Sequence, residues 1–179
     1  MVQIGRTTLH FNDPIGGFHQ ESLHLEEAMI RLIDGAKYSL HIVSFSLPAY
    51  SPRWYLHGAV DRAAKRGLSI KIHAHKYSEV YNLLDRLRDF RPEPEGWHYL
   101  PDPTEQKDPV DGNSGALFHI KAIMVDGNKI YIGSANLSQN AVKENSEWGL
   151  VSESPEMCMQ LEQYLRHLEN KGNFQRVLR

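Results

Sequence analysis

The 179-residue chain has a single cysteine, Cys158, which excludes an intrachain disulfide framework and any zinc site built from several cysteines. It also lacks an apolar run of transmembrane length, so we expect no membrane partner. A large excess of one charge is missing too: the formal net charge is -2, and any affinity for a polyanion must come from local patches. The first residues lack the pattern of a secretion signal, and a soluble, cytoplasmic protein is therefore expected.

Hydrophobic residues make up 41% of the chain, which is enough for one globular domain over residues 1–179. Helical and strand patterns alternate along its first half, and this order is typical of βαβ units. The sequence therefore predicts an α/β fold with a mixed, largely parallel sheet that helices flank on both faces. The segments behind this prediction are a helix over 25–33 that ends at Gly35, a strand over 38–45, a helix over 54–66 that ends at Gly67, and a strand over 68–74.

The second half predicts a helix over 80–90, a short strand over 97–100, a last strand over 147–151 and a closing helix over 156–168. Between them, residues 101–115 are rich in proline and aspartate and have no apolar periodicity. Loops of this kind carry function in many proteins, and we expect this one to face a substrate.

A β-hairpin is predicted where two β-rich runs, 117–125 and 129–132, flank the turn sequence Asp126-Gly127-Asn128. A loop made of the last two turn residues pairs Lys121 with Ser134, and His119 with Asn136. A loop made of the first two pairs His119 with Ser134 instead. Because side chains alternate with a period of two, both registers put these four polar residues on one face.

Two further residues of the hairpin have predicted roles. Gly133 has no side chain, so a bound anion could approach the backbone there. Asp126 lies one residue off the series of His119 and Lys121 and sits at the turn, so it should not touch the His119 of its own chain. We assign Asp126 a structural or cross-site role.

The spacing of these residues resembles the signature of the phospholipase D superfamily, His-x-Lys-x4-Asp-x6-Gly-Ser-x-Asn. Most members of that family carry two copies in one chain, whereas this sequence has one. It is similar in this respect to a short subclass of bacterial endonucleases, and to the related mitochondrial cardiolipin hydrolase and small-RNA nuclease, which dimerise to bring two motifs together. The residues that match are His119, Lys121, Asp126, Gly133, Ser134 and Asn136.

The resemblance implies a phospholipase D-like α/β/α sandwich that acts as a homodimeric phosphodiesterase, most simply a nuclease on DNA or RNA. His119 of one subunit would attack phosphorus and form a phosphohistidine, and His119 of the partner subunit would protonate the leaving oxygen. Imidazole suits both roles because its ordinary pKa is about 6.5. This chemistry needs no metal ion and no cofactor, and no acidic cluster lies near the hairpin in the sequence.

The same resemblance distributes the supporting roles. Lys121 and Asn136 would hold the non-bridging phosphate oxygens, and Ser134 would donate to those oxygens or to an imidazole. Glu147 lies where single-motif members carry a downstream glutamate, and we expect it to fix the tautomer of His119.

Two other functions stay open. A phospholipid hydrolase of the cardiolipin type uses the same chemistry, although the chain has no membrane-anchoring segment. A catalytically silent nucleic-acid binding module would keep the fold, although the intact motif argues against it. The pair His73 and His75 also alternates on a predicted strand, and we interpret it as core or surface rather than as a set of ligands.

Overall fold

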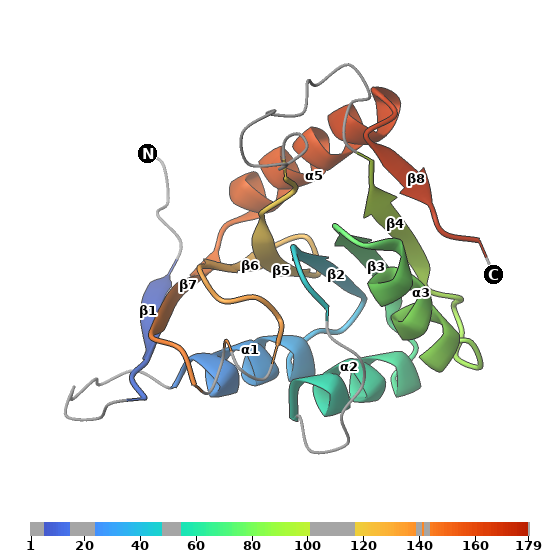
Figure 1. Cartoon of the computed structure of the whole chain (residues 1–179). Helices are drawn as coiled ribbons and strands as arrows, with labels where there is room; N and C mark the ends of the chain where they lie inside the picture. The colour runs from blue at the N-terminus through green and yellow to red at the C-terminus, as the bar shows by residue number, and fades with distance from the viewer. Residues whose placement is uncertain are drawn as a thin grey trace, which may run out of the picture.

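The computed structural model describes residues 6–14, 24–47, 55–100, 117–138, 141 and 144–178. In this part of the chain one eight-stranded sheet has the order β1-β7-β6-β5-β2-β3-β4-β8. The helix α5 crosses one side of the sheet, and α1 and α2 lie on the opposite side (Figure 1). The strands are β1 (Thr7–Asn12), β2 (Ser39–Ser44), β3 (Ser69–Ala74), β4 (Glu95–Tyr99), β5 (Lys121–Val125), β6 (Lys129–Gly133), β7 (Glu147–Glu153) and β8 (Phe174–Arg176). The helices are α1 (Leu25–Asp34), α2 (Tyr55–Lys65), α3 (Tyr77–Arg86) and α5 (Pro155–Asn170).

The predicted α/β class and the helices on both faces of a mixed sheet are confirmed, but the sheet is not largely parallel. Only the pairs β2–β3 and β3–β4 are parallel among the strand pairs of the described residues. The other five pairs are antiparallel. One reason is that a short turn joins β5 to β6, and antiparallel neighbours need no crossover connection.

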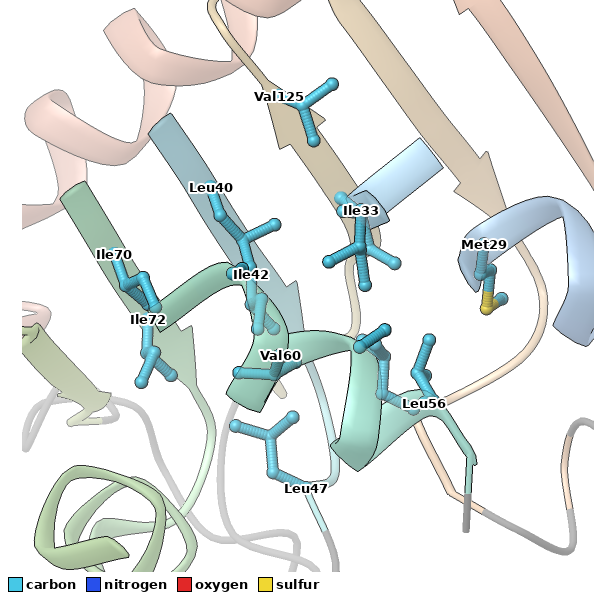
Figure 2. Close-up of a cluster of buried hydrophobic side chains, with 14 of the residues drawn as sticks. Met29, Ile33, Leu40, Ile42, Leu47, Leu56, Val60, Ile70, Ile72 and Val125 are labelled. Carbon is cyan, nitrogen blue, oxygen red and sulfur yellow. The ribbon is translucent and has the colours of Figure 1, made fainter. Parts of the chain in front are cut away.

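The larger core lies between the sheet and the helices α1, α2 and α3. On β2, Leu40 and Ile42 point to this side, while Val43 points to the other. Figure 2 shows Leu40 and Ile42 facing Ile33 of α1 and Val60 of α2 across this core. The smaller core lies under α5. It contains Val43, Ala122, Met124, Ile130, Cys158 and Leu165.

Helix α5 begins close to where the pattern predicted because its first turn is well capped. The Ser154 hydroxyl accepts a hydrogen bond from the Met157 backbone N–H, and Pro155 occupies the first helical position. Helix α3 begins at Tyr77, three residues before its predicted start. The first three residues, Tyr77, Ser78 and Glu79, include no buried apolar side chain, so the periodicity did not reveal them.

The hairpin of β5 and β6 forms as predicted, but both predicted registers are wrong. Val125 pairs with Lys129 and Ala122 with Ile132, so three residues lie between the paired strands. Asp126 takes a left-handed conformation, with φ of 53°, which an aspartate tolerates better than most residues. The extra residue shifts the pairing by one, and Ser134 therefore does not face Lys121 or His119 across the hairpin.

No helix in the described residues is long and apolar enough to cross a membrane. The predicted substrate-facing loop over 101–115 and the expected helix start at Trp54 lie outside the described residues.

Candidate active site

All of the predicted site residues except Asp126 gather at one edge of the sheet, where β2 and β6 end and β5 and β7 begin. Ser44 at the end of β2 pairs with Lys121 at the start of β5. Gly133 at the end of β6 pairs with Gly149 near the start of β7. The polar residues therefore meet because these strands share an edge, not because they share one face of the hairpin. In α/β sheets such an edge is a common place for a ligand.

His119 and Lys121 are in direct contact at this edge. The Lys121 Nζ lies 2.7 Å from Nδ1 of His119 and donates to the His119 carbonyl oxygen at 2.9 Å. The Lys121 side chain is buried, with 5% exposed, whereas the His119 side chain is open to solvent. Phe45 packs beside both, with its ring centroid 4.7 Å from the His119 ring and 5.5 Å from Nζ. The lysine thus sits behind an exposed imidazole.

The electrostatics of this pair favour a neutral imidazole. Desolvation, followed by the charge of Lys121, lowers the pKa of His119 below its ordinary value of 6.5. Desolvation also lowers the pKa of Lys121, and the carboxylate of Glu147 works in the opposite direction. A lysine ammonium can only donate, so it holds Nδ1 of His119 unprotonated.

Ser134 and Glu147 form a second contact at the same edge. The Ser134 hydroxyl donates to Oε2 of Glu147 and accepts from the backbone N–H of Trp148 at 3.1 Å. Glu147 was predicted to fix the tautomer of His119, but no hydrogen bond joins the two within the described part of the chain. Glu147 instead orients Ser134 and adds negative charge near Lys121.

Asn136 lies in the turn after β6, and its Oδ1 is buried without a hydrogen-bond partner among the described residues. The backbone carbonyl of the same residue accepts from Ser138 N–H at 2.7 Å. A buried polar atom without a partner is unusual in a folded protein. Its Oδ1 can only accept a hydrogen bond, so the amide NH₂ is the group of Asn136 that could donate to a phosphate oxygen.

Asp126 was predicted among the site residues, with a structural or cross-site role, and its contacts are structural. Its carboxylate accepts from the backbone N–H groups of Lys37, Tyr38 and Ser39, with the shortest distance 2.7 Å. Burial would raise the pKa of Asp126, but these hydrogen bonds lower it below its usual range. The residue lies at the far end of β5 from His119 and anchors the turn to the start of β2.

Gly133 has a packing role that the sequence did not reveal. The side chain of Tyr131 lies across Gly133 and Gly149, and a Cβ atom on either glycine would collide with it. On Gly133 such an atom would also lie 2.5 Å from the Trp148 carbonyl oxygen. The two glycines let β6 and β7 pack around a fully buried tyrosine directly below the site.

This packing predicts different outcomes for two alanine substitutions. Gly149→Ala should destabilise the fold by about 1–3 kcal/mol, the usual result of overpacking. In a Tyr131→Leu background the same change should have little further effect, because the three atoms nearest to a Cβ on Gly149 all belong to Tyr131. Gly133→Ala should remain destabilising there, since the Trp148 carbonyl stays in place. Urea unfolding of the four variants and their parents measures this, and equal rescue of both glycine changes would contradict it.

Two residues at the site were not identified from the sequence. Phe45 lies between His119 and His75, with its ring 5.1 Å from that of His75. The position of His75 directly after the end of β3 was the available signal. His73, interpreted together with it, is instead buried under α5, where Nε2 lies 2.8 Å from Oε1 of Glu169.

Metal binding by side chains is not indicated: no group of three histidine, cysteine, aspartate or glutamate residues in the described ranges is placed to hold an ion. The site consists of one exposed imidazole, one buried ammonium and hydroxyl, amide and carboxylate groups. These can act as a nucleophile and as ligands for an anion.

Comparisons with known proteins concern the family and the fold of this chain. The family described as "Cardiolipin synthase, PLD-like domain" matches residues 29–169. Cardiolipin synthase C of Escherichia coli (strain K12) is 42% identical over 45 residues, which are 25% of this chain and 10% of that protein. The matched segment is thus a small part of the relative's length.

Two solved structures share the fold over nearly their whole length. Nuc from Salmonella typhimurium, a phospholipase D family member, superposes with a TM-score of 0.65 at 19% identity, covering 96% of this chain and 97% of that one. NucT from Helicobacter pylori gives a TM-score of 0.65 at 19% identity, covering 92% and 96%. Because the family match spans most of the sequence and a single copy of the motif is present, the chain belongs to the phospholipase D superfamily as a single-motif member.

Proposed function

We propose that this protein is a metal-independent phosphodiesterase, a nuclease that cleaves DNA or RNA through a phosphohistidine at a site shared by two subunits. The observation that carries the proposal is the buried Lys121 ammonium held against the exposed imidazole of His119. A buried cation beside a neutral nucleophile suits attack on an anionic phosphodiester, which the cation attracts and orients.

In the first step a substrate phosphate draws the Lys121 ammonium onto its non-bridging oxygens and releases the lone pair of His119. The ring is open to solvent, so its two tautomers exchange through water. An imidazole nitrogen bonds to phosphorus, the P–O bond to the leaving group breaks, and the leaving oxygen takes a proton from His119 of the partner subunit. The amide group of Asn136 donates to the phosphoryl oxygens, and the Ser134 hydroxyl joins it by turning its single proton from Glu147 to the phosphate.

In the second step His119 of the partner subunit, now neutral, accepts a proton from water. The water oxygen attacks phosphorus, the P–N bond breaks, and the imidazole of His119 is restored. One histidine is the nucleophile and the other is the general acid and then the general base. At the start of the reaction the first ring must therefore be neutral and the second protonated. Glu147 and Asp126 do not touch the substrate. Glu147 orients Ser134, and Asp126 anchors the turn of the hairpin to the start of β2.

Exposed apolar side chains beside the site support the shared arrangement. Trp148, next to Glu147, is 48% exposed, and Leu117, two residues before His119, is 59% exposed. A second copy of the chain would cover the same residues in an isologous contact and bring a second His119 to the same edge.

A second candidate function is phospholipid hydrolysis. The local identity to cardiolipin synthase C favours it, since that relative's name concerns a phospholipid.

One experiment tests both functions. Purified protein in excess EDTA should cleave single-stranded DNA, RNA or duplex DNA and leave cardiolipin-containing vesicles intact, because Lys121 supplies the charge that a metal ion would otherwise supply. Products are resolved on gels and by lipid extraction. If the protein hydrolyses only the phospholipid of the vesicles, the nuclease function is wrong and the phospholipid hydrolase function takes its place. Loss of all activity in EDTA, restored by magnesium, would contradict a metal-independent mechanism.

A further inference from the structure

An exposed pair of tyrosines stands at the start of α3, close to the site. Tyr77 and Tyr81 are 49% and 39% exposed. Their ring centroids lie 6.0 Å apart, with planes only 19° from parallel. The ring of His98, from β4, meets Tyr77 edge-on at 5.3 Å. Three rings from two elements thus form one aromatic surface that is partly open to solvent.

This surface continues from the catalytic edge. The ring of His119 contacts Phe45, and Phe45 contacts His75. His75 is the first residue beyond β3, and Tyr77 begins α3 two residues later. Ring contacts therefore lead from the imidazole that attacks phosphorus as far as His75, two residues before the tyrosine pair begins.

The charge beside the tyrosines suits a phosphate backbone. Lys76, between His75 and Tyr77, is 58% exposed, and its Nζ lies 3.5 Å from Glu79. The Glu79 side chain is only 14% exposed. It accepts from the backbone N–H of Leu47 at 2.7 Å and from the Ser46 hydroxyl at 3.3 Å. Because these groups already occupy Glu79, the Lys76 ammonium can turn to a phosphate at low cost.

We propose that Tyr77, Tyr81 and His98 form a stacking subsite for unpaired nucleobases, which makes single-stranded nucleic acid the substrate class of this enzyme. The proposal rests on the proposed nuclease function and names its substrate. Aromatic side chains bind single strands by stacking on base faces, a contact that tolerates any sequence. In a duplex the neighbouring bases cover those faces, so a duplex cannot use this surface.

The test compares the wild type with a Tyr77→Ala/Tyr81→Ala variant and a Tyr77→Phe/Tyr81→Phe variant. Binding of a short fluorescent oligothymidylate is followed by anisotropy, and hydrolysis of bis(p-nitrophenyl) phosphate reports the catalytic centre. The alanine variant should bind the oligonucleotide roughly 5- to 150-fold more weakly, as expected when a base loses its stack. The phenylalanine variant should bind like the wild type, and all three should hydrolyse the small phosphodiester alike. Tyr164→Ala, an equally exposed tyrosine on α5, is the matched control.

A strand with abasic sites separates stacking from charge. The wild type and the alanine variant should bind it equally weakly. Unchanged binding of the oligothymidylate by the alanine variant would overturn the subsite and leave the nuclease function standing. An equal loss of affinity for duplex or abasic strands would overturn it as well. If the wild type hydrolyses the small phosphodiester but neither binds nor cleaves any nucleic acid, the nuclease function fails and the subsite fails with it.

Discussion

Replacing His119 by alanine is expected to reduce cleavage by at least about 10²–10⁴-fold, the usual value of one acid–base group, with the further loss of the nucleophile. The fold should remain intact because the side chain is exposed and, among the described residues, makes its polar contact with Lys121. Initial rates on a single-stranded substrate and urea unfolding measure the two effects. His167→Ala, another exposed histidine, on α5, should match the wild type in both.

Mixed dimers make this prediction sharper. If each bond needs both histidines, a dimer with one wild-type and one His119→Ala subunit is inactive. After full exchange of equal amounts of the two proteins, activity should fall to about one quarter of that of the same total protein in wild-type form, since a two-fold site joins subunits at random. A value of one half would mean independent subunits. Substantial cleavage by the pure variant would remove His119 from the mechanism.

The intermediate gives a third readout. Rapid acid-free quenching of a reaction with a phosphate-labelled substrate should leave label on the wild-type protein that is lost in acid, as a P–N bond requires. The label should map to the peptide that contains His119. A stable label on a serine or threonine would identify another nucleophile.

Acidification is expected to destabilise the fold through the histidines buried under α5. Nε2 of His41 lies 2.9 Å from Nδ1 of His73, which in turn contacts Glu169. Desolvation lowers the pKa of His73 to about 4, against the opposing effect of Glu169, and lowers the pKa of His41 as well. Lys71 on the same strand lowers both further. Both rings are therefore neutral in the folded protein at neutral pH.

The direction of the effect follows from linkage. Above pH 6.5 both folded and unfolded states hold neutral rings, and stability is unaffected. Between about 6.5 and 4 the unfolded chain binds protons that the folded protein excludes, so stability falls as the pH falls. For His73 alone, the shift from 6.5 to about 4 corresponds to a loss of about 3 kcal/mol. Its side chain is only 2% exposed, so solvent screens little of this loss.

Urea unfolding at pH 7 and pH 4.5 measures this loss in the wild type and in His73→Phe. Phenylalanine preserves the parallel stack on Trp97, whose ring lies 4.7 Å from that of His73. The variant should lose clearly less stability on acidification than the wild type. The substitution leaves the charged groups around the two rings unchanged. These groups lie on β3, β4 and α5 and are Lys71, Glu95, Glu162, Arg166 and Glu169. An identical pH dependence in both proteins would contradict the buried-histidine explanation.

Much of the fold follows from the spacing of apolar residues. The alternation over 25–74 predicted α1, β2, α2 and β3 because each has a clear apolar side that the core buries. The edge strands β1 and β8 were not predicted. Thr7–Asn12 exposes three of its six residues and buries only one, and Phe174–Arg176 is only three residues long. Neither has enough buried positions to show a period of two.

The sequence predicted which residues form the site better than it predicted how they are arranged. The spacing of His119 and Lys121 predicted that both side chains face the same way, since residues two apart lie on one side of a strand. The structure adds that the two side chains are in contact. The position of Ser134 depended on the register, which one left-handed residue in the turn changed. Its partner, Glu147, lies on β7, and the pairing of β6 with β7 is a long-range contact that no local pattern encodes. The contact between Phe45 and His119 is also long-range, so no local sequence pattern predicted it.

The strand β1 protects more than its own six residues. It pairs along the whole outer side of β7, from Thr7 opposite Ser152 to Asn12 opposite Glu147. Shortening the protein beyond Asn12 would leave every outward N–H and C=O of β7 unsatisfied, as a template on which another molecule could add a strand. The strand left unpaired is β7, which contains Glu147 and the exposed Trp148. A pairing of β7 with another molecule would therefore cause aggregation and disrupt the catalytic edge at the same time.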